Sequence, residues 1–137
     1  MPYSERVKRA LDFATEKHKG QKRIGGEDYI THPIAVCEIV KNLGFGEDYQ
    51  IAALFHDLLE DTNTTKKEIL SYGNDDILTA VKLLTKQKGY DIQEYVKAIK
   101  NNEIAFVVKG ADRLHNLECA IETDVEFKRK YILETVD

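Results

Sequence analysis

The sequence contains few of the residues and patterns that mark specialised classes of protein. Tryptophan is absent, and the 137 residues include only two cysteines, two prolines and one methionine. Cys37 and Cys119 are isolated and not in CxxC spacing, so we expect two reduced thiols rather than a disulfide or a cysteine-bound zinc ion. Apolar stretches such as IAALF and IAFVV are too short to span a bilayer, and MPYSERVKRA lacks the apolar core of a signal peptide. We therefore expect a cytoplasmic protein with no membrane partner.

An excess of positive charge is also missing. The chain has 20 lysines and arginines against 24 aspartates and glutamates, a formal net charge of -4. No expected helix is predominantly basic, and both features argue against nucleic acid as a partner. The length is that of one domain, so we expect residues 1–137 to form a single domain.

The chain reads as a series of helices separated by short loops, which predicts an all-α fold. Ser4 can cap a first helix, and Thr65 begins the capping-box pattern TKKE of a later one. Thr31 to Leu43 reads as a helix with a proline in its first turn and a glycine after its end. We expect another helix from Asp48 to Leu59. Further helices fit DDILTAVKLLT, DIQEYVKAIK, EIAFVVKGADRLHNLECAI and DVEFKRKYILETV.

Polar residues interrupt the apolar run of AALFHDLLEDT, residues 52–62. On a continuous helix His56, Asp57, Glu60 and Asp61 would share one broad face. The simplest interpretation is a core histidine satisfied by a carboxylate, next to an exposed acidic helix end. Against it, carboxylates rarely enter an apolar run unless they are paired or metal-bound, and two acids at a helix C-terminus oppose its dipole. Locally unfavourable residues of this kind tend to mark a functional site.

A divalent cation would offset these costs, because it turns repulsion between carboxylates into ligation. His32 begins the preceding helix, and Asp112 follows an apolar run, so both are candidates to join His56 and Asp57. The simpler role of His32 is that of a helix cap or a surface histidine, and that of Asp112 is a buried ion pair with Arg113. Two imidazoles and two carboxylates without a thiolate suit manganese, iron or zinc, with positions left open for water and substrate.

The order His32, His56-Asp57 and Asp112 resembles the HD superfamily of metal-dependent phosphohydrolases. GQKRIGGEDYITHP, ALFHDLLEDT and VKGADRLHN resemble, in the same order, three signature segments of the hydrolase domain of RelA/SpoT-type alarmone enzymes. TKQKGYDIQEYVKAIKNN is closer to the small stand-alone HD proteins related to that domain. The resemblance implies an HD-domain helical bundle that holds one Mn²⁺ ion through these four residues, with no synthetase domain after Asp137.

The resemblance also implies a reaction, the removal of the 3′-pyrophosphate from guanosine tetra- or pentaphosphate (ppGpp or pppGpp). Glu60 and Asp61 match the family's catalytic pair: Glu60 would orient or deprotonate the attacking water, and Asp61 would assist it. Arg23 matches a loop arginine near the substrate's phosphates, and Asn116 a residue near the nucleotide. A surface charge and a helix cap are the simpler roles of these two. From its spacing, His115 is expected to give a supporting hydrogen bond rather than to bind metal.

Two positions that are positively charged in the alarmone hydrolases differ in this chain. Ile24 stands where lysine is usual, and Glu118 where arginine is usual. We therefore expect alarmone hydrolysis that is limited by binding. One alternative is the same chemistry on another nucleotide or phosphate ester. A second is a non-catalytic module that binds a nucleotide, but such a module would not need Glu60 and Asp61.

Overall fold

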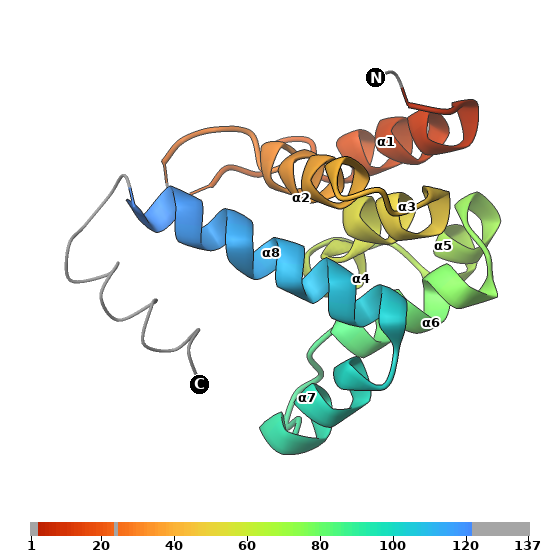
Figure 1. Ribbon diagram of the computed structural model, residues 1–137. Coiled ribbons are helices and arrows are strands. Elements are labelled where there is room, and N and C mark those ends of the chain that lie inside the picture. Colours follow the sequence, from red (N-terminus) through yellow and green to blue (C-terminus); the bar gives the residue numbers. More distant parts are fainter. Residues whose placement is uncertain (1–2, 24, 122–137) are drawn as a thin grey trace.

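Helices make up the regular structure of the protein in the computed structural model, which describes residues 3–23 and 25–121 (Figure 1). The helices are α1 (Glu5–Lys17), α2 (Thr31–Asn42), α3 (Glu47–Phe55), α4 (Leu58–Asp61), α5 (Lys66–Tyr72), α6 (Asp75–Leu84), α7 (Ile92–Lys100) and α8 (Glu103–Ile121). The predicted all-α class is confirmed. The expected helix in DVEFKRKYILETV lies outside the described residues. Within the described ranges, no helix is both long and apolar enough to cross a membrane.

The helix ends follow from local capping chemistry. The Ser4 side chain accepts a hydrogen bond from the backbone N–H of Val7 and caps α1. Thr65 and Glu68 form the reciprocal capping box at the start of α5. Gly44, two residues after α2, has φ +92°, a left-handed conformation that favours glycine. These predicted boundaries are confirmed.

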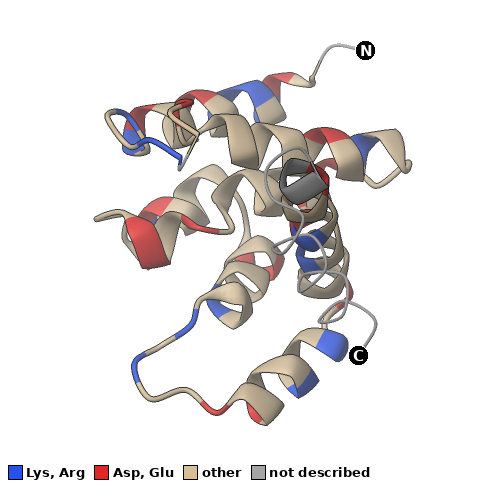
Figure 2. Ribbon diagram, turned by 90° about the vertical axis from the view of Figure 1, so that its left-hand side faces the viewer, with Lys and Arg blue, Asp and Glu red and all other residues tan. Residues whose placement is uncertain are grey.

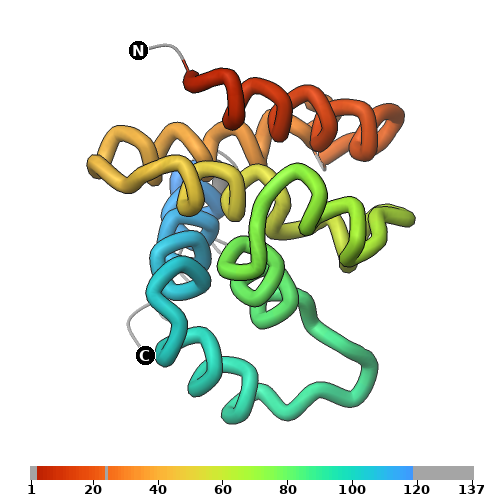
Figure 3. The backbone as a smooth tube through the Cα atoms, turned by 90° about the vertical axis from the view of Figure 1, so that its right-hand side faces the viewer, coloured from red at the N-terminus to blue at the C-terminus, as the bar shows by residue number. Residues whose placement is uncertain are grey.

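Helix α3 is the centre of the bundle. It packs against α1 and α2 on one side and against α6 and α8 on the other, as Figures 1 and 3 show. Its last five residues, Ile51–Phe55, are fully buried. Helix α7 packs on α6 and α8 and has no major contact with α3. The apolar run IAALF therefore belongs to the hydrophobic core, and the polar residues that follow it begin at the centre of the bundle.

The prediction of one helix from Asp48 to Leu59 is wrong, because the chain leaves the helical path at His56 and Asp57. The imidazole Nδ1 of His56 donates to the carbonyl oxygen of Ala53 at 2.6 Å. In a continuous helix that carbonyl would accept the backbone N–H of Asp57. Glu60 and Asp61 therefore lie in the single-turn helix α4, and the argument from the dipole of a long helix does not apply to them.

The one cysteine whose side chain is described is buried. Cys37 lies in α2, is fully buried and is a free thiol. Burial raises the pKa of this thiol to about 12, so it stays protonated and unreactive at neutral pH. The side chain of Cys119 lies outside the described part of the chain.

Candidate metal centre and active site

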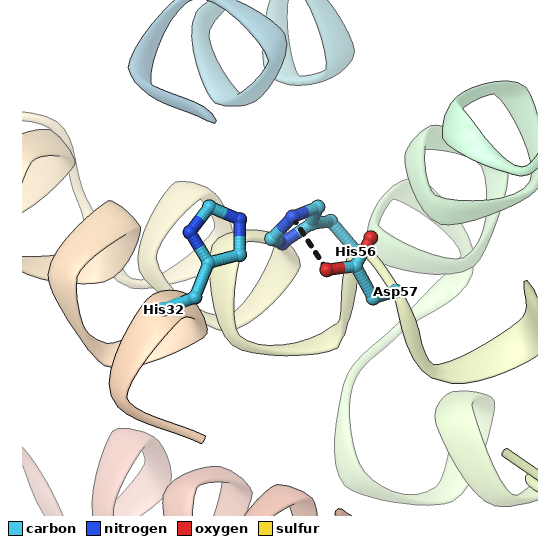
Figure 4. Close-up of side chains that lie close together, drawn as sticks. All are labelled: His32, His56 and Asp57. Carbon is cyan, nitrogen blue, oxygen red and sulfur yellow. Dashed lines mark ion pairs between the residues drawn. The ribbon is translucent and has the colours of Figure 1, made fainter. Parts of the chain in front are cut away.

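Three segments far apart in the sequence bring histidine and carboxylate side chains together at the centre of the bundle. His32 comes from the first turn of α2, while His56 and Asp57 come from the break after α3 (Figure 4). One potential ligand atom from each lies within 4.8 Å of the others. Both histidines are buried. At the break, His56 Nε2 lies 3.1 Å from Asp57 Oδ2, and both side chains lie beside His32.

Asp112 of α8 completes the group. Its Oδ1 atom lies 2.7 Å from His32 Nε2 and 3.4 Å from His56 Nε2. Its Oδ2 atom is 3.6 Å from Lys109 Nζ, one turn earlier on α8. The structure thus brings together the four side chains that the sequence suggested as ligands, and we refer to His32, His56, Asp57 and Asp112 as the floor of the site.

Strong electrostatic coupling joins the floor residues. Burial alone would lower the pKa of His56, but Asp57 and Asp112 raise it to about 10. Burial would raise the pKa of Asp57, but His56 and the Tyr29 hydroxyl lower it to about 2. Despite burial, the hydrogen bond from His32 and the charge of His56 hold the pKa of Asp112 far below its usual range. The proton on His56 thus balances part of the carboxylate charge, and a divalent cation would take its place.

The floor fits a divalent cation. Nε2 of His56 is buried, and no hydrogen bond of acceptable geometry reaches it from the described residues. Its Nδ1 is held by the carbonyl of Ala53, while Nδ1 of His32 lies 2.8 Å from Nδ1 of His115. Both floor imidazoles therefore keep Nε2 for the centre of the site, the orientation that outer hydrogen bonds impose on metal-binding histidines. The supporting hydrogen bond expected of His115 is present.

Tyr29, which the sequence analysis did not anticipate, reaches the floor from the loop before α2. Its hydroxyl donates to Asp57 Oδ2 at 2.7 Å and lies 3.5 Å from Asp61 Oδ2. Burial and the charge of Asp57 raise its pKa, so the hydroxyl keeps its proton and orients the carboxylate. Tyr29 lies three residues before His32 in the sequence, and this short spacing could have indicated that both side chains reach the same site.

Glu60 and Asp61 are the exposed residues of α4 and lie at the edge of the site, where Figure 2 shows a cluster of acidic residues. Oxygen atoms of Asp57, Glu60 and Asp61 lie within 4.8 Å of one another. Glu60 Oε1 accepts the backbone N–H of Lys86 at 2.8 Å, and the backbone oxygen of Asp61 accepts Gln21 Nε2 at 2.8 Å. Burial and the charges of Asp57 and Glu60 raise the pKa of Asp61. Two loops thus hold the acidic pair beside the floor.

Arg23 and Asn116 meet at another part of the edge. Arg23 Nη2 donates to Asn116 Oδ1 at 3.5 Å, and Arg23 Nη1 lies 3.5 Å from His115 Nδ1. Lys22, on the same loop as Arg23, forms an ion pair with Asp28. Ile24 lies outside the described residues.

A cavity of about 280 Å³ joins these parts. Its lining contains the four floor residues and six edge residues, which are Arg23, Tyr29, Glu60, Asp61, Lys86 and Asn116. The lining also contains Leu84 at the end of α6, Tyr95 of α7 and Lys109 of α8. Lys86, Tyr95 and Lys109 were not anticipated from the sequence.

A helical bundle around two buried imidazoles and two partly buried carboxylates defines a class of divalent-metal-binding domains. The HD domain model matches residues 10–137, and the chain belongs to this family. It is 33% identical to guanosine-3′,5′-bis(diphosphate) 3′-pyrophosphohydrolase of Aquifex aeolicus, over 98% of this chain and 20% of that protein. It is 35% identical to the protein of the same name from Borreliella burgdorferi, over 80% of this chain and 18% of that protein.

The chain spans about a fifth of the length of these curated relatives. A solved structure of similar size gives a fuller match, with a TM-score of 0.79 and 26% identity over 97% of this chain and 83% of that one. That structure is described as a metazoan ortholog of SpoT that hydrolyzes ppGpp. The likeness therefore extends over the whole helical frame that positions the site.

Proposed function

We propose that this chain is a metal-dependent phosphohydrolase that removes the 3′-pyrophosphate from ppGpp and pppGpp. The relatives named above carry this activity in their names or description. The observation that supports it most directly is the proximity of the floor to Glu60 and Asp61 within one cavity. A site that only bound a nucleotide would not need a water-activating carboxylate pair beside its metal ligands.

His32, His56, Asp57 and Asp112 would hold the cation, and Mn²⁺ is the ion we propose for this mixed donor set. When bound, the cation supplies Lewis-acid chemistry, lowering the pKa of water and withdrawing charge from a phosphoryl oxygen. Tyr29 keeps Asp57 in a fixed orientation through its 2.7 Å hydrogen bond. His115 does the same for His32.

Glu60 takes a proton from the attacking water. The water oxygen forms a bond to the phosphorus nearest the ribose, and the bond from that phosphorus to the 3′-oxygen breaks. Asp61 has a raised pKa, so its carboxyl is suited to returning a proton to the 3′-oxygen. The products are pyrophosphate and a nucleotide with a free 3′-hydroxyl. Arg23 and Asn116 would contact the substrate at their part of the edge.

A hydrolysis screen tests the proposal. Protein loaded with Mn²⁺ would be incubated with ppGpp, pppGpp and a panel of other nucleotides and phosphate esters, with Glu60→Gln protein as the blank. We expect pyrophosphate release from the two alarmones, and much less from nucleotides without a 3′-pyrophosphate. If the protein cleaved another ester and left the alarmones intact, the broader phosphohydrolase function would take the place of alarmone hydrolysis. The exposed acid Glu118, which stands where the alarmone hydrolases usually have arginine, favours this second function.

A further inference from the structure

Two lysines and a tyrosine form a second polar group on the cavity wall, which the proposed mechanism does not use. Lys86 Nζ and Lys109 Nζ each lie 5.9 Å from the centroid of the Tyr95 ring. All three residues line the cavity that contains the floor. They come from three different segments, the chain after α6, helix α7 and helix α8, so the fold and not local sequence brings them together.

Tyr95 acts as the platform of this Lys86–Tyr95–Lys109 cluster. Its hydroxyl donates to the carbonyl oxygen of Leu84 at 2.9 Å, which ties α7 to the end of α6. Burial and the charges of Glu60 and Asp112 raise the pKa of Tyr95 to about 12, so the hydroxyl keeps its proton at neutral pH. A ring face within about 6 Å attracts an ammonium group, and here one ring attracts two.

The cluster is joined directly to the reacting part of the site. Lys109 Nζ lies 3.6 Å from Asp112 Oδ2, and the backbone N–H of Lys86 holds Glu60 Oε1. On α8, Lys109 and Asn116 are seven residues apart, which is about 10 Å along a helix axis. The cluster and the Arg23–Asn116 contact therefore occupy different ends of the cavity, with Asp112 between them.

The charges around the cavity indicate that these lysines help to bind an anionic group. The lining carries four carboxylates, from Asp57, Glu60, Asp61 and Asp112, against three cationic side chains, from Arg23, Lys86 and Lys109. With the proton on His56 described above, the cavity is about neutral without metal, and it is only weakly positive once a divalent cation has replaced that proton. A pyrophosphate group carries several negative charges, and two of the three cationic side chains lie at the Tyr95 end.

We propose that Lys86 and Lys109, positioned by Tyr95, form the subsite for the outer phosphate of the pyrophosphate group that is removed. The inference rests on the proposed function and identifies specificity residues for it. The inner phosphate, at which the ester bond breaks, lies at the floor beside Glu60. The outer phosphate extends along α8 to the two ammonium groups, which hydrogen-bond to it. A 3′-monophosphate would leave this subsite empty, so the cluster selects for a 3′-diphosphate.

Charge-removing variants test this assignment. Lys86→Met and Lys109→Met keep most of the side-chain length, and Tyr95→Leu removes the platform. Lys88→Met is the matched control, because Lys88 is exposed on the same loop as Lys86 but does not line the cavity. KM and kcat would be measured for guanosine 5′-diphosphate carrying either a 3′-diphosphate or a 3′-monophosphate. Mn²⁺ affinity and Tm would be measured for each variant.

We expect Lys86→Met to raise KM for the 3′-diphosphate roughly fivefold, the effect of a charged hydrogen bond at a solvent-screened site, with kcat within about twofold of the parent. KM for the 3′-monophosphate should not change. Lys109→Met and Tyr95→Leu should show the same selectivity, and Lys88→Met should match the parent. Equal KM changes for both nucleotides, or none for either, would overturn the assignment.

Direct binding keeps the test independent of turnover. Inorganic pyrophosphate and inorganic phosphate would be titrated calorimetrically into Mn²⁺-loaded parent, Lys86→Met and Lys88→Met proteins. The subsite predicts roughly fivefold weaker binding of pyrophosphate to Lys86→Met alone, with inorganic phosphate unaffected. That result would stand even if the protein hydrolysed neither nucleotide, in which case the proposed function and not the subsite would fail. Equal pyrophosphate affinity in all three proteins would reject the subsite.

Discussion

The floor and the edge of the site are built in different ways. The floor lies inside the bundle, where short contacts such as the 2.7 Å pair between His32 and Asp112 join side chains from different helices. At the edge, Glu60 and Asp61 are exposed, and Arg23 reaches Asn116 only at 3.5 Å. Core packing fixes the floor, whereas loops and single side-chain contacts fix the edge. Metal binding should therefore depend on the bundle, and turnover and substrate choice on the edge.

The largest expected effect comes from breaking the floor. Asp57→Ala removes a proposed ligand and leaves the buried His56 without its neighbouring carboxylate. We expect Mn²⁺ affinity to fall by more than the roughly 10–100-fold that outer hydrogen-bond partners of metal sites contribute, and activity to be lost with it. Isothermal titration calorimetry would measure the affinity. Asp12→Ala, an exposed carboxylate on α1, is the control. Full metal binding by the Asp57 variant would remove it from the ligand set.

Breaking the edge should separate catalysis from metal binding. Glu60→Gln keeps the size and a hydrogen-bond acceptor for the Lys86 amide but cannot take a proton from water. Turnover should fall about a hundredfold or more, the scale of general acid–base groups, while the Mn²⁺ affinity stays at the parent value. Single-turnover kinetics and calorimetry would give the two quantities. If both fell together, Glu60 would belong with the floor.

The proton released on metal binding should distinguish the floor from the edge without removing a proposed ligand. In the metal-free protein Asp57 and Asp112 raise the pKa of His56 to about 10, whereas a cation binds the neutral imidazole. Metal binding near neutral pH therefore expels a proton, and the Mn²⁺ affinity should rise about tenfold for each unit increase in pH. Calorimetry in buffers of different ionisation enthalpy counts the proton. Glu60→Gln should release it too, and a parent protein that released none would contradict the ionisation assigned to the floor.

The smallest expected effect concerns charge at the edge. Glu118 is exposed on α8, and its charge acts on His115 beside Arg23. Glu118→Arg should lower KM for ppGpp roughly threefold with little change in kcat, because an exposed charge is screened and acts on binding alone. The gain should shrink as ionic strength rises. Glu16 is exposed on α1 and does not line the cavity, so Glu16→Arg makes the same charge change away from the site and should leave KM as it is.

The parts of the fold that the sequence predicted are those with local causes. Capping chemistry at Ser4 and Thr65 depends on residues within one turn, so it can be recognised without tertiary structure. The four floor residues were found because polar groups next to apolar runs are costly, and because their order resembles a known family. Both signals can be recognised in short segments of the sequence.

The parts that escaped prediction depend on competition or on distant contacts. The helix break at His56 arises because an imidazole takes the Ala53 carbonyl from the backbone, and helix periodicity does not report that competition. Lys109 was not anticipated because its role depends on α7 packing against α8, which brings Tyr95 to it. The hydrogen bond from Tyr29 to Asp57 likewise crosses between a loop and the end of α3.

The brevity of α4 has a consequence for amide hydrogen exchange. A four-residue turn is not stable alone, and this one is tied to its surroundings by the Gln21 contact to Asp61 and the Lys86 contact to Glu60. The amides of Asp61 and Thr62 should therefore exchange through local opening, whereas those of the buried residues Ile51–Phe55 of α3 require global unfolding. In that opened state the protein would keep its bound cation but lose the carboxylate pair, so hydrolysis would stop and resume without release of the metal.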